Sequence, residues 1–169
     1  MMWNTHVVAG MTAGIIATNM IEASDFKVIF SSVVLAGISS LIPDIDTPQS
    51  KYGRKLPVVS SILRIIFGHR KGFFHSLLGA AVVSWLISHL AQSLIGINVI
   101  LPVFAGYLSH LLLDSLTPGG CYWLWPIRKK VGVSLVKTGG AAELFVVFPL
   151  FIFSFLGFSW LTLQGLYCF

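Results

Sequence analysis

The stretch that decides the fold is residues 97–116, which read INVILPVFAGYLSHLLLDSL. It is apolar over most of its length, and a helix of about 20 apolar residues crosses the roughly 30 Å hydrocarbon core of a bilayer. Two ionisable residues, His110 and Asp114, lie near its end. Their spacing of four residues places both side chains on one helix face. The stretch therefore predicts a membrane-crossing helix with a polar pair close to one membrane surface.

Four further apolar stretches predict spans over about 5–21, 28–42, 73–91 and 141–163, the second of which is short. The first has no basic segment before it, and we expect it to be retained rather than cleaved as a signal peptide. Hydrophobic residues make up 56% of the 169 residues and charged residues only 10%. Soluble domains carry more charge, and disordered chains have the opposite balance. We expect an all-α polytopic membrane helix bundle of about five spanning helices, forming one domain over residues 1–169.

Basic residues orient this predicted bundle. All of the 11 Lys and Arg residues except Lys27 lie in the connections after the second and the fourth span. Lys and Arg gather in cytoplasmic loops, so we expect a cytoplasmic N-terminus and an outside C-terminus. The net charge of +5 then reflects topology, and we expect no nucleic-acid partner. The apolar segment 56–67 is too short to span and predicts an interfacial helix on the membrane surface.

Histidine and acidic residues gather at the cytoplasmic end of all five predicted spans. Ionisable side chains at membrane depth are rare and mark functional sites. Ordinary polar helix ends would give mixed residue types on both faces, whereas only Glu22, Asp25 and His89 fall on the opposite side. The pattern therefore predicts a metal site. The converging residues are His6, Asp44, Asp46, His75, His110, Asp114 and Glu143.

Two of the local motifs also have a plainer interpretation. The spacing of His110 and Asp114 fits a buried histidine held by an acidic acceptor as well as a chelating pair. Asp44 and Asp46 lie among prolines and fit simple helix termination. However, carboxylates at the C-terminal end of a helix oppose its dipole, so we expect a positive charge beside them, either a divalent ion or the adjacent basic loop.

Mixed histidine and carboxylate ligands suit zinc, with manganese as the alternative, better than magnesium or calcium. The number of candidates allows one or two ions. A carboxylate not needed as a ligand, Glu143 or Asp46, is the predicted general base, and Glu143 is also a candidate for orienting a ligand. Arg54, Arg70 and Lys71 are predicted to hold a substrate phosphate. Arg70 and Lys71 fit equally well as anchors of membrane topology.

Short motifs extend through most of the chain to about Glu143. Before the third predicted span the chain reads Lys71-Gly-Phe-Phe-His-Ser76, with Arg70 one place earlier. The other motifs are Thr5-His6, Leu41-Ile-Pro-Asp-Ile-Asp46, Ser50 through Arg54, Gly68-His69-Arg70, Gly106-Tyr-Leu-Ser-His110, Asp114-Ser-Leu-Thr-Pro118 and Leu124-Trp-Pro126. Together they resemble the YdjM-type inner-membrane proteins, a LexA-regulated family described as membrane-bound, metal-dependent hydrolases. That family typically reads Arg-Gly-x-Thr-His-Ser before the third span.

The order of the ligands is in turn similar to that of the zinc-dependent phospholipase C and P1 nuclease group. This similarity implies that Asp44 or Asp46, His75, His110 and Asp114 bind one ion, and that His6 with Asp114 holds a second. The group supplies further histidines after its H-x-x-x-D pair. No histidine follows His110 in this chain, so we do not expect a three-metal cluster.

These observations predict metal-assisted hydrolysis of a phosphoester in a lipid or lipid-linked substrate at the cytoplasmic face of the inner membrane. The candidate ligands lie at the depth of headgroup phosphates, and the apolar spans can accommodate acyl tails. One alternative is a metal-ion transporter or sensor, which needs ligands near the bilayer midplane and a path to both sides. The other is a noncatalytic scaffold in which a structural metal joins the helices. The oligomeric state is left open.

Overall fold

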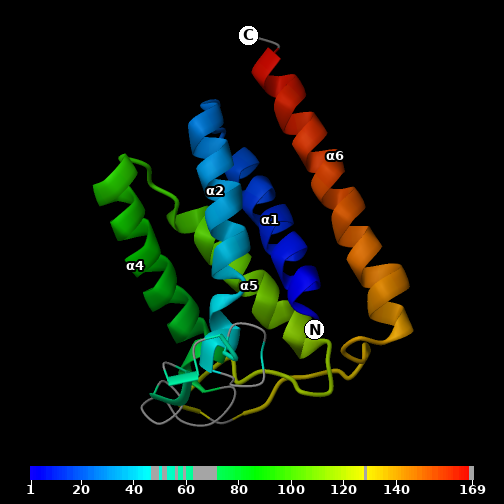
Figure 1. Cartoon of the computed structure of the whole chain (residues 1–169). Helices are drawn as coiled ribbons and strands as arrows, with labels where there is room; N and C mark the ends of the chain where they lie inside the picture. Colours follow the sequence, from blue (N-terminus) through cyan, green and yellow to red (C-terminus); the bar gives the residue numbers. More distant parts are fainter. Residues whose placement is uncertain are drawn as a thin grey trace.

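The computed structural model describes residues 1–46, 50, 53–55, 57–58, 60–62, 72–127 and 129–167, with the side chains of 46, 166 and 167 excepted. Helices dominate this part of the chain, and its only bridge between extended segments joins Cys121 and Val131. The prediction of an all-α bundle is confirmed. Its long helices run side by side (Figure 1): α1 (Trp3–Met20), α2 (Phe26–Ser39), α4 (Leu77–Ile95), α5 (Ile100–Ser115) and α6 (Phe148–Tyr167).

Three helical segments are long and apolar enough to cross a membrane: Phe26–Ile45, Leu77–Ile95 and Glu143–Gly165. Helix α5 is apolar but shorter, at 16 residues. Helix α1 is not among these segments, although it matches the first predicted span. It packs against α2, α5 and α6, and its buried residues include Thr5, Thr12 and Thr18. A helix covered by its neighbours needs a less apolar surface than one that faces lipid, which accounts for the weaker hydrophobic character of α1.

Small residues bring α1, α2 and α5 into close contact. A Cβ atom added to Gly10 would lie 2.6 Å from the Cβ of Ser40, and one added to Gly14 would lie 2.6 Å from the Cβ of Ala36. A Cβ on Gly106 of α5 would overlap the carbonyl oxygen of Ala36. Small residues four apart allow membrane helices to approach at backbone distance. The residues that end α2 are therefore held against both α1 and α5.

The N-terminus and the described parts of the connections α2–α4 and α5–α6 lie at one end of the bundle, and the C-terminus lies at the other (Figure 1). We call the end of the bundle that holds the N-terminus and these two connections the site end. The two basic connections thus share one end, as the predicted topology requires. Within the predicted interfacial segment 56–67, residues 57–58 and 60–62 are helical, and the others lie outside the described residues.

Helix α6 begins through a π-helical turn, η3 (Glu143–Val147), which the sequence analysis did not predict. Pro149, two residues after this turn, has no N–H to donate to the carbonyl four residues earlier, so regular α-helical bonding is interrupted there. Helix α6 contacts α1, and its apolar segment is otherwise exposed to the surroundings of the bundle.

Candidate metal centre

Five of the seven converging residues meet at the site end. Their side chains come from four elements that are distant in the sequence. His75, His110 and His6 are at most 1% exposed, and Asp114 is 8% exposed. Ionisable groups buried together in this way need hydrogen bonds, a partner of opposite charge or a bound ion. The five are His6 in the first turn of α1, Asp44 in η1 (Ile42–Asp46), His75 in η2 (Phe73–His75), and His110 and Asp114 near the end of α5.

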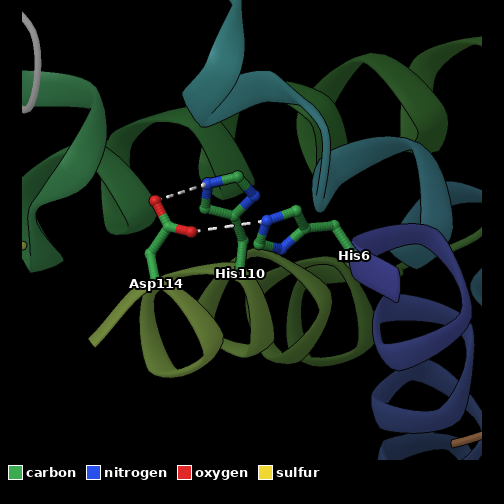
Figure 2. Close-up of side chains that lie close together, drawn as sticks. All are labelled: His6, His110 and Asp114. Atoms are coloured by element: carbon green, nitrogen blue, oxygen red, sulfur yellow. Dashed lines mark ion pairs between the residues drawn. The ribbon is translucent and has the colours of Figure 1, made fainter. Parts of the chain in front are cut away.

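Asp114 lies between the three histidines. Its Oδ1 is 3.4 Å from Nε2 of His6, and its Oδ2 is 3.8 Å from Nε2 of both His75 and His110. Figure 2 shows the carboxylate of Asp114 facing the ring of His110, which is on the same helix, and the ring of His6, which comes from α1. Two ligand atoms that bind one zinc ion at about 2.1 Å each lie at most about 4.2 Å apart. All three separations are compatible with a shared ion.

The candidate ligands form two overlapping groups. In one, ligand atoms of His6, His110 and Asp114 lie within 4.8 Å of one another, and in the other those of Asp44, His75 and His110 do. The rings of His75 and His110 have centroids 5.4 Å apart, and those of His6 and His110 are stacked at 3.9 Å. The two groups therefore share His110. Of the two predicted aspartates, Asp44 is placed beside the histidines; the side chain of Asp46 lies outside the described part.

The ring of His110 is oriented by the end of α2. Its Nδ1 lies 2.6 Å from the carbonyl oxygen of Ser40, and a carbonyl can only accept a hydrogen bond. Nδ1 therefore donates, and in the neutral ring Nε2 carries the lone pair. Nε2 is buried without a hydrogen-bond partner among the described residues, and it lies across from the Asp114 carboxylate. A ring lone pair and a carboxylate that face each other repel, and a divalent ion between them would remove this repulsion, so these residues fit such an ion.

A second layer of hydrogen bonds positions the neighbouring ligands. The hydroxyl of Tyr107 donates to the carbonyl of Phe74, the residue before His75, at 2.7 Å. The indole of Trp123 donates to the hydroxyl of Ser115, the residue after Asp114, at 2.8 Å. Outer partners of this kind fix ligand orientation in metal sites. The sequence analysis did not assign them, although a buried Tyr or Trp that must satisfy its polar atom is a usable signal.

Glu143 is fully buried but lies outside both groups of candidate ligands. Its Oε1 accepts a hydrogen bond from the backbone N–H of Met2 at 2.6 Å, and its Oε2 accepts one from Gly139 at 2.7 Å. The amino group of Met1 in turn lies 2.9 Å from Oδ1 of Asp114. Of the two roles predicted for Glu143, these contacts favour positioning over proton transfer, since both oxygens are held by backbone donors.

The Glu143→Gln variant separates these two roles. The amide nitrogen would face a backbone N–H, and an unsatisfied buried donor costs about 1–3 kcal/mol. We expect a lower melting temperature and an unchanged metal content, measured by thermal unfolding and by elemental analysis. Glu22→Gln, at an exposed acid of the opposite end, is the matched control and should alter neither. Full stability with lost turnover would instead assign Glu143 a chemical role.

The predicted phosphate-binding residues are placed only in part. Arg54 is exposed in the turn 53–55. Arg70 and Lys71 lie outside the described residues, and their role stays a prediction.

Comparison with known proteins gives a consistent family. The family model described as YdjM inner membrane protein matches residues 1–168. The inner membrane protein YdjM of Escherichia coli K12 is 32% identical over 158 residues, which cover 88% of this chain and 79% of that protein. The uncharacterized protein YvsG of Bacillus subtilis 168 is 33% identical over 147 residues, 85% of each chain. The E. coli inner membrane protein YbcI is 36% identical over 105 residues, 59% of this chain and 54% of that one. No solved structure matches the chain.

Proposed function

The chain belongs to the YdjM inner membrane protein family, and we propose that it is a membrane-embedded, metal-dependent hydrolase. Its proposed substrate is a phosphoester of a lipid or lipid-linked compound at the cytoplasmic membrane interface. The observation that supports this most directly is the buried Nε2 of His110, which has no hydrogen-bond partner in the described structure and faces the carboxylate of Asp114. A divalent cation between them would bind the Nε2 lone pair and the carboxylate together.

The ligand geometry favours a single ion. His110 belongs to both groups of ligands but uses Nδ1 to bond Ser40, so only Nε2 is available. His6, Asp44, His75 and Asp114 surround that atom, and zinc or manganese fits this donor set. When bound, such an ion supplies Lewis acidity: it polarises a phosphoryl oxygen and makes water a stronger nucleophile at neutral pH. A carboxylate among Asp44 and Asp114 that is not needed as a ligand would accept the proton of the attacking water.

The depth of the centre supports a lipid phosphate as the substrate. Asp44 lies at the end of the apolar segment Phe26–Ile45, and His75 lies just before the segment Leu77–Ile95. Headgroup phosphates are found where the apolar spans stop, so a phosphoester could reach the ligands while its alkyl chains stay in the hydrocarbon. Arg54, together with Arg70 and Lys71 from the sequence prediction, would pair with the phosphate charge.

A direct test combines metal analysis with a substrate panel. The purified protein in detergent or nanodiscs is analysed for zinc and manganese and then incubated with phospholipids and isoprenoid phosphates. We expect phosphate or headgroup release that stops on chelation and returns on adding zinc. A metal-loaded protein that hydrolyses no member of the panel would contradict the proposal.

A structural metal is the second candidate, because the three histidines are almost completely buried. Cobalt substitution distinguishes it, since absorption spectra report whether the ion has a closed four-coordinate shell or an open position. Structural sites are closed, whereas catalytic sites keep a position for water or substrate. The transporter alternative has less support: the described residues form no comparable group of ligands at the opposite end.

A further inference from the structure

A groove with a volume of about 370 Å³ lies between α5 and α6 along one side of α1. Its walls are formed by side chains of α1, of α5 with the residue that follows it, and of α6: Ala9, Thr12, Ala13, Ile16, Ser109, Leu112, Leu113, Leu116 and Phe151. Leu112 in its wall is 57% exposed, so the groove opens toward the surroundings of the bundle. In a membrane these surroundings are the acyl chains of the bilayer.

The groove offers almost no polar atom to an occupant. Thr12 is in its wall, but its hydroxyl lies 2.8 Å from the carbonyl of Val8 and 3.3 Å from that of Phe151. Ser109 donates to the carbonyl of Gly106 at 2.7 Å. Because these hydroxyls are bonded within the protein and the other lining groups are apolar, the groove suits a hydrocarbon occupant.

The groove begins at the level of the candidate metal centre and extends into the membrane. Ala9 lies one helical turn beyond His6, and Leu113 precedes Asp114. With a rise of about 1.5 Å per residue, Ile16 at the far end lies about 15 Å along α1 from His6. This is close to half of the roughly 30 Å hydrocarbon core, which is the thickness of one leaflet. A lipid with its phosphate at the ligands would direct an alkyl chain along this path.

We propose that this groove binds one alkyl chain of the lipid substrate while its headgroup occupies the candidate metal centre; the assignment of that lipid as substrate rests on the proposed function. A second apolar cavity, lined by Phe26, Phe30 and Leu163 among others, has a volume of about 180 Å³. It lies toward the opposite end of the bundle, where the described residues form no ligand group. Of these two apolar cavities, only the larger groove begins at the level of the candidate ligands, since its lining residues Ala9 and Leu113 are close in the sequence to His6 and Asp114.

Photo-labelling tests the groove without knowledge of the reaction. The protein is placed in phosphatidylethanolamine nanodiscs that contain phosphatidylglycerol with a diazirine in the middle of one acyl chain. After irradiation, the labelled peptides are mapped by mass spectrometry. We expect labelling to concentrate on the groove residues of α1 and α5, relative to the exposed α4 face that carries Ala81 and Val82.

Matched tryptophan variants sharpen this test. Ala13→Trp fills the groove and should abolish most of the labelling there, whereas Ala81→Trp on the exposed face of α4 should leave it unchanged. If Ala13→Trp does not fold, Ala13→Leu should reduce the labelling in part. Equal labelling of the groove and of α4, or labelling that Ala13→Trp does not lower, would overturn the proposal. Cross-linked dimers formed through the groove would also overturn it, because a second copy would then be the occupant.

The outcome for the groove is separable from that for the hydrolase. His110→Ala removes a ligand and no groove residue, so the groove should still be labelled in this variant, at a lower level because the headgroup contact is lost. Groove labelling without turnover of any lipid would refute the hydrolase and support alkyl-chain binding. Turnover without groove labelling would support the hydrolase and refute alkyl-chain binding in the groove.

Discussion

Replacing His110 by alanine is expected to remove bound zinc almost completely. Both groups of candidate ligands contain this residue, so its loss breaks both, whereas loss of His6 leaves the group of Asp44, His75 and His110 intact. Since removing even an outer partner of a ligand weakens metal binding by about 10–100-fold, we expect a loss larger than about 100-fold for His110→Ala and a smaller loss for His6→Ala. Elemental analysis and competition with a zinc chelator measure the affinity.

Stability gives an independent readout of the same variant. Zinc at about 100 times its dissociation constant should raise the free energy of unfolding of the native protein by about 2.7 kcal/mol, and that of His110→Ala hardly at all. His89→Ala, at an exposed histidine on α4, is the control and should retain zinc. Asp114→Asn preserves the shape of the side chain and removes its charge. It tests the same centre if His110→Ala fails to fold. Native zinc content in both ligand variants would exclude this centre.

Replacing Gly106 by alanine is expected to destabilise the protein by about 3 kcal/mol, the upper part of the range for overpacked cores. The new methyl group would overlap the carbonyl oxygen of Ala36, which is backbone and cannot rotate away. Helices α2 and α5 must then separate. Because Ser40, four residues after Ala36, accepts the hydrogen bond from His110, the separation should also lower zinc affinity.

The control for Gly106→Ala is Gly157→Ala in α6, where an added Cβ meets nothing within 4 Å. Alanine is the better helix former there, so stability should stay equal or rise slightly. Thermal unfolding of both variants in one detergent, with zinc content measured in parallel, gives the comparison. Equal stability of the two would show that α2 and α5 are not in backbone contact at Ala36.

The helical bundle could be expected from sequence, because the apolar length of each segment is a local property. His110 and Asp114 share a helix, so their spacing alone makes them neighbours. For His6, Asp44 and His75, the predicted topology gives only a membrane depth shared with His110 and Asp114. Depth does not determine which helices touch.

The remaining features depend on long-range packing. The contact of Ser40 with His110 requires Gly10, Gly14 and Gly106 to admit α2 between its neighbours, a relation among three helices that no single segment encodes. Glu143 accepts one hydrogen bond from Gly139, which is four positions away, and one from Met2, which is 141 positions away. Only the folded arrangement reveals the bond to Met2. The π-helical turn was missed because its hydrophobic pattern does not differ from that of an α-helix.

The order of the ligands along the chain has a consequence for biosynthesis. The first is at position 6 and the last at position 114, and α6 contributes none. A nascent chain that has not yet inserted α5 cannot complete the ligand set, so its early histidines stay in an unfinished bundle during translation. Once α5 has entered the bilayer, every candidate ligand is present, so the proposed ion could be bound before α6 packs against α1.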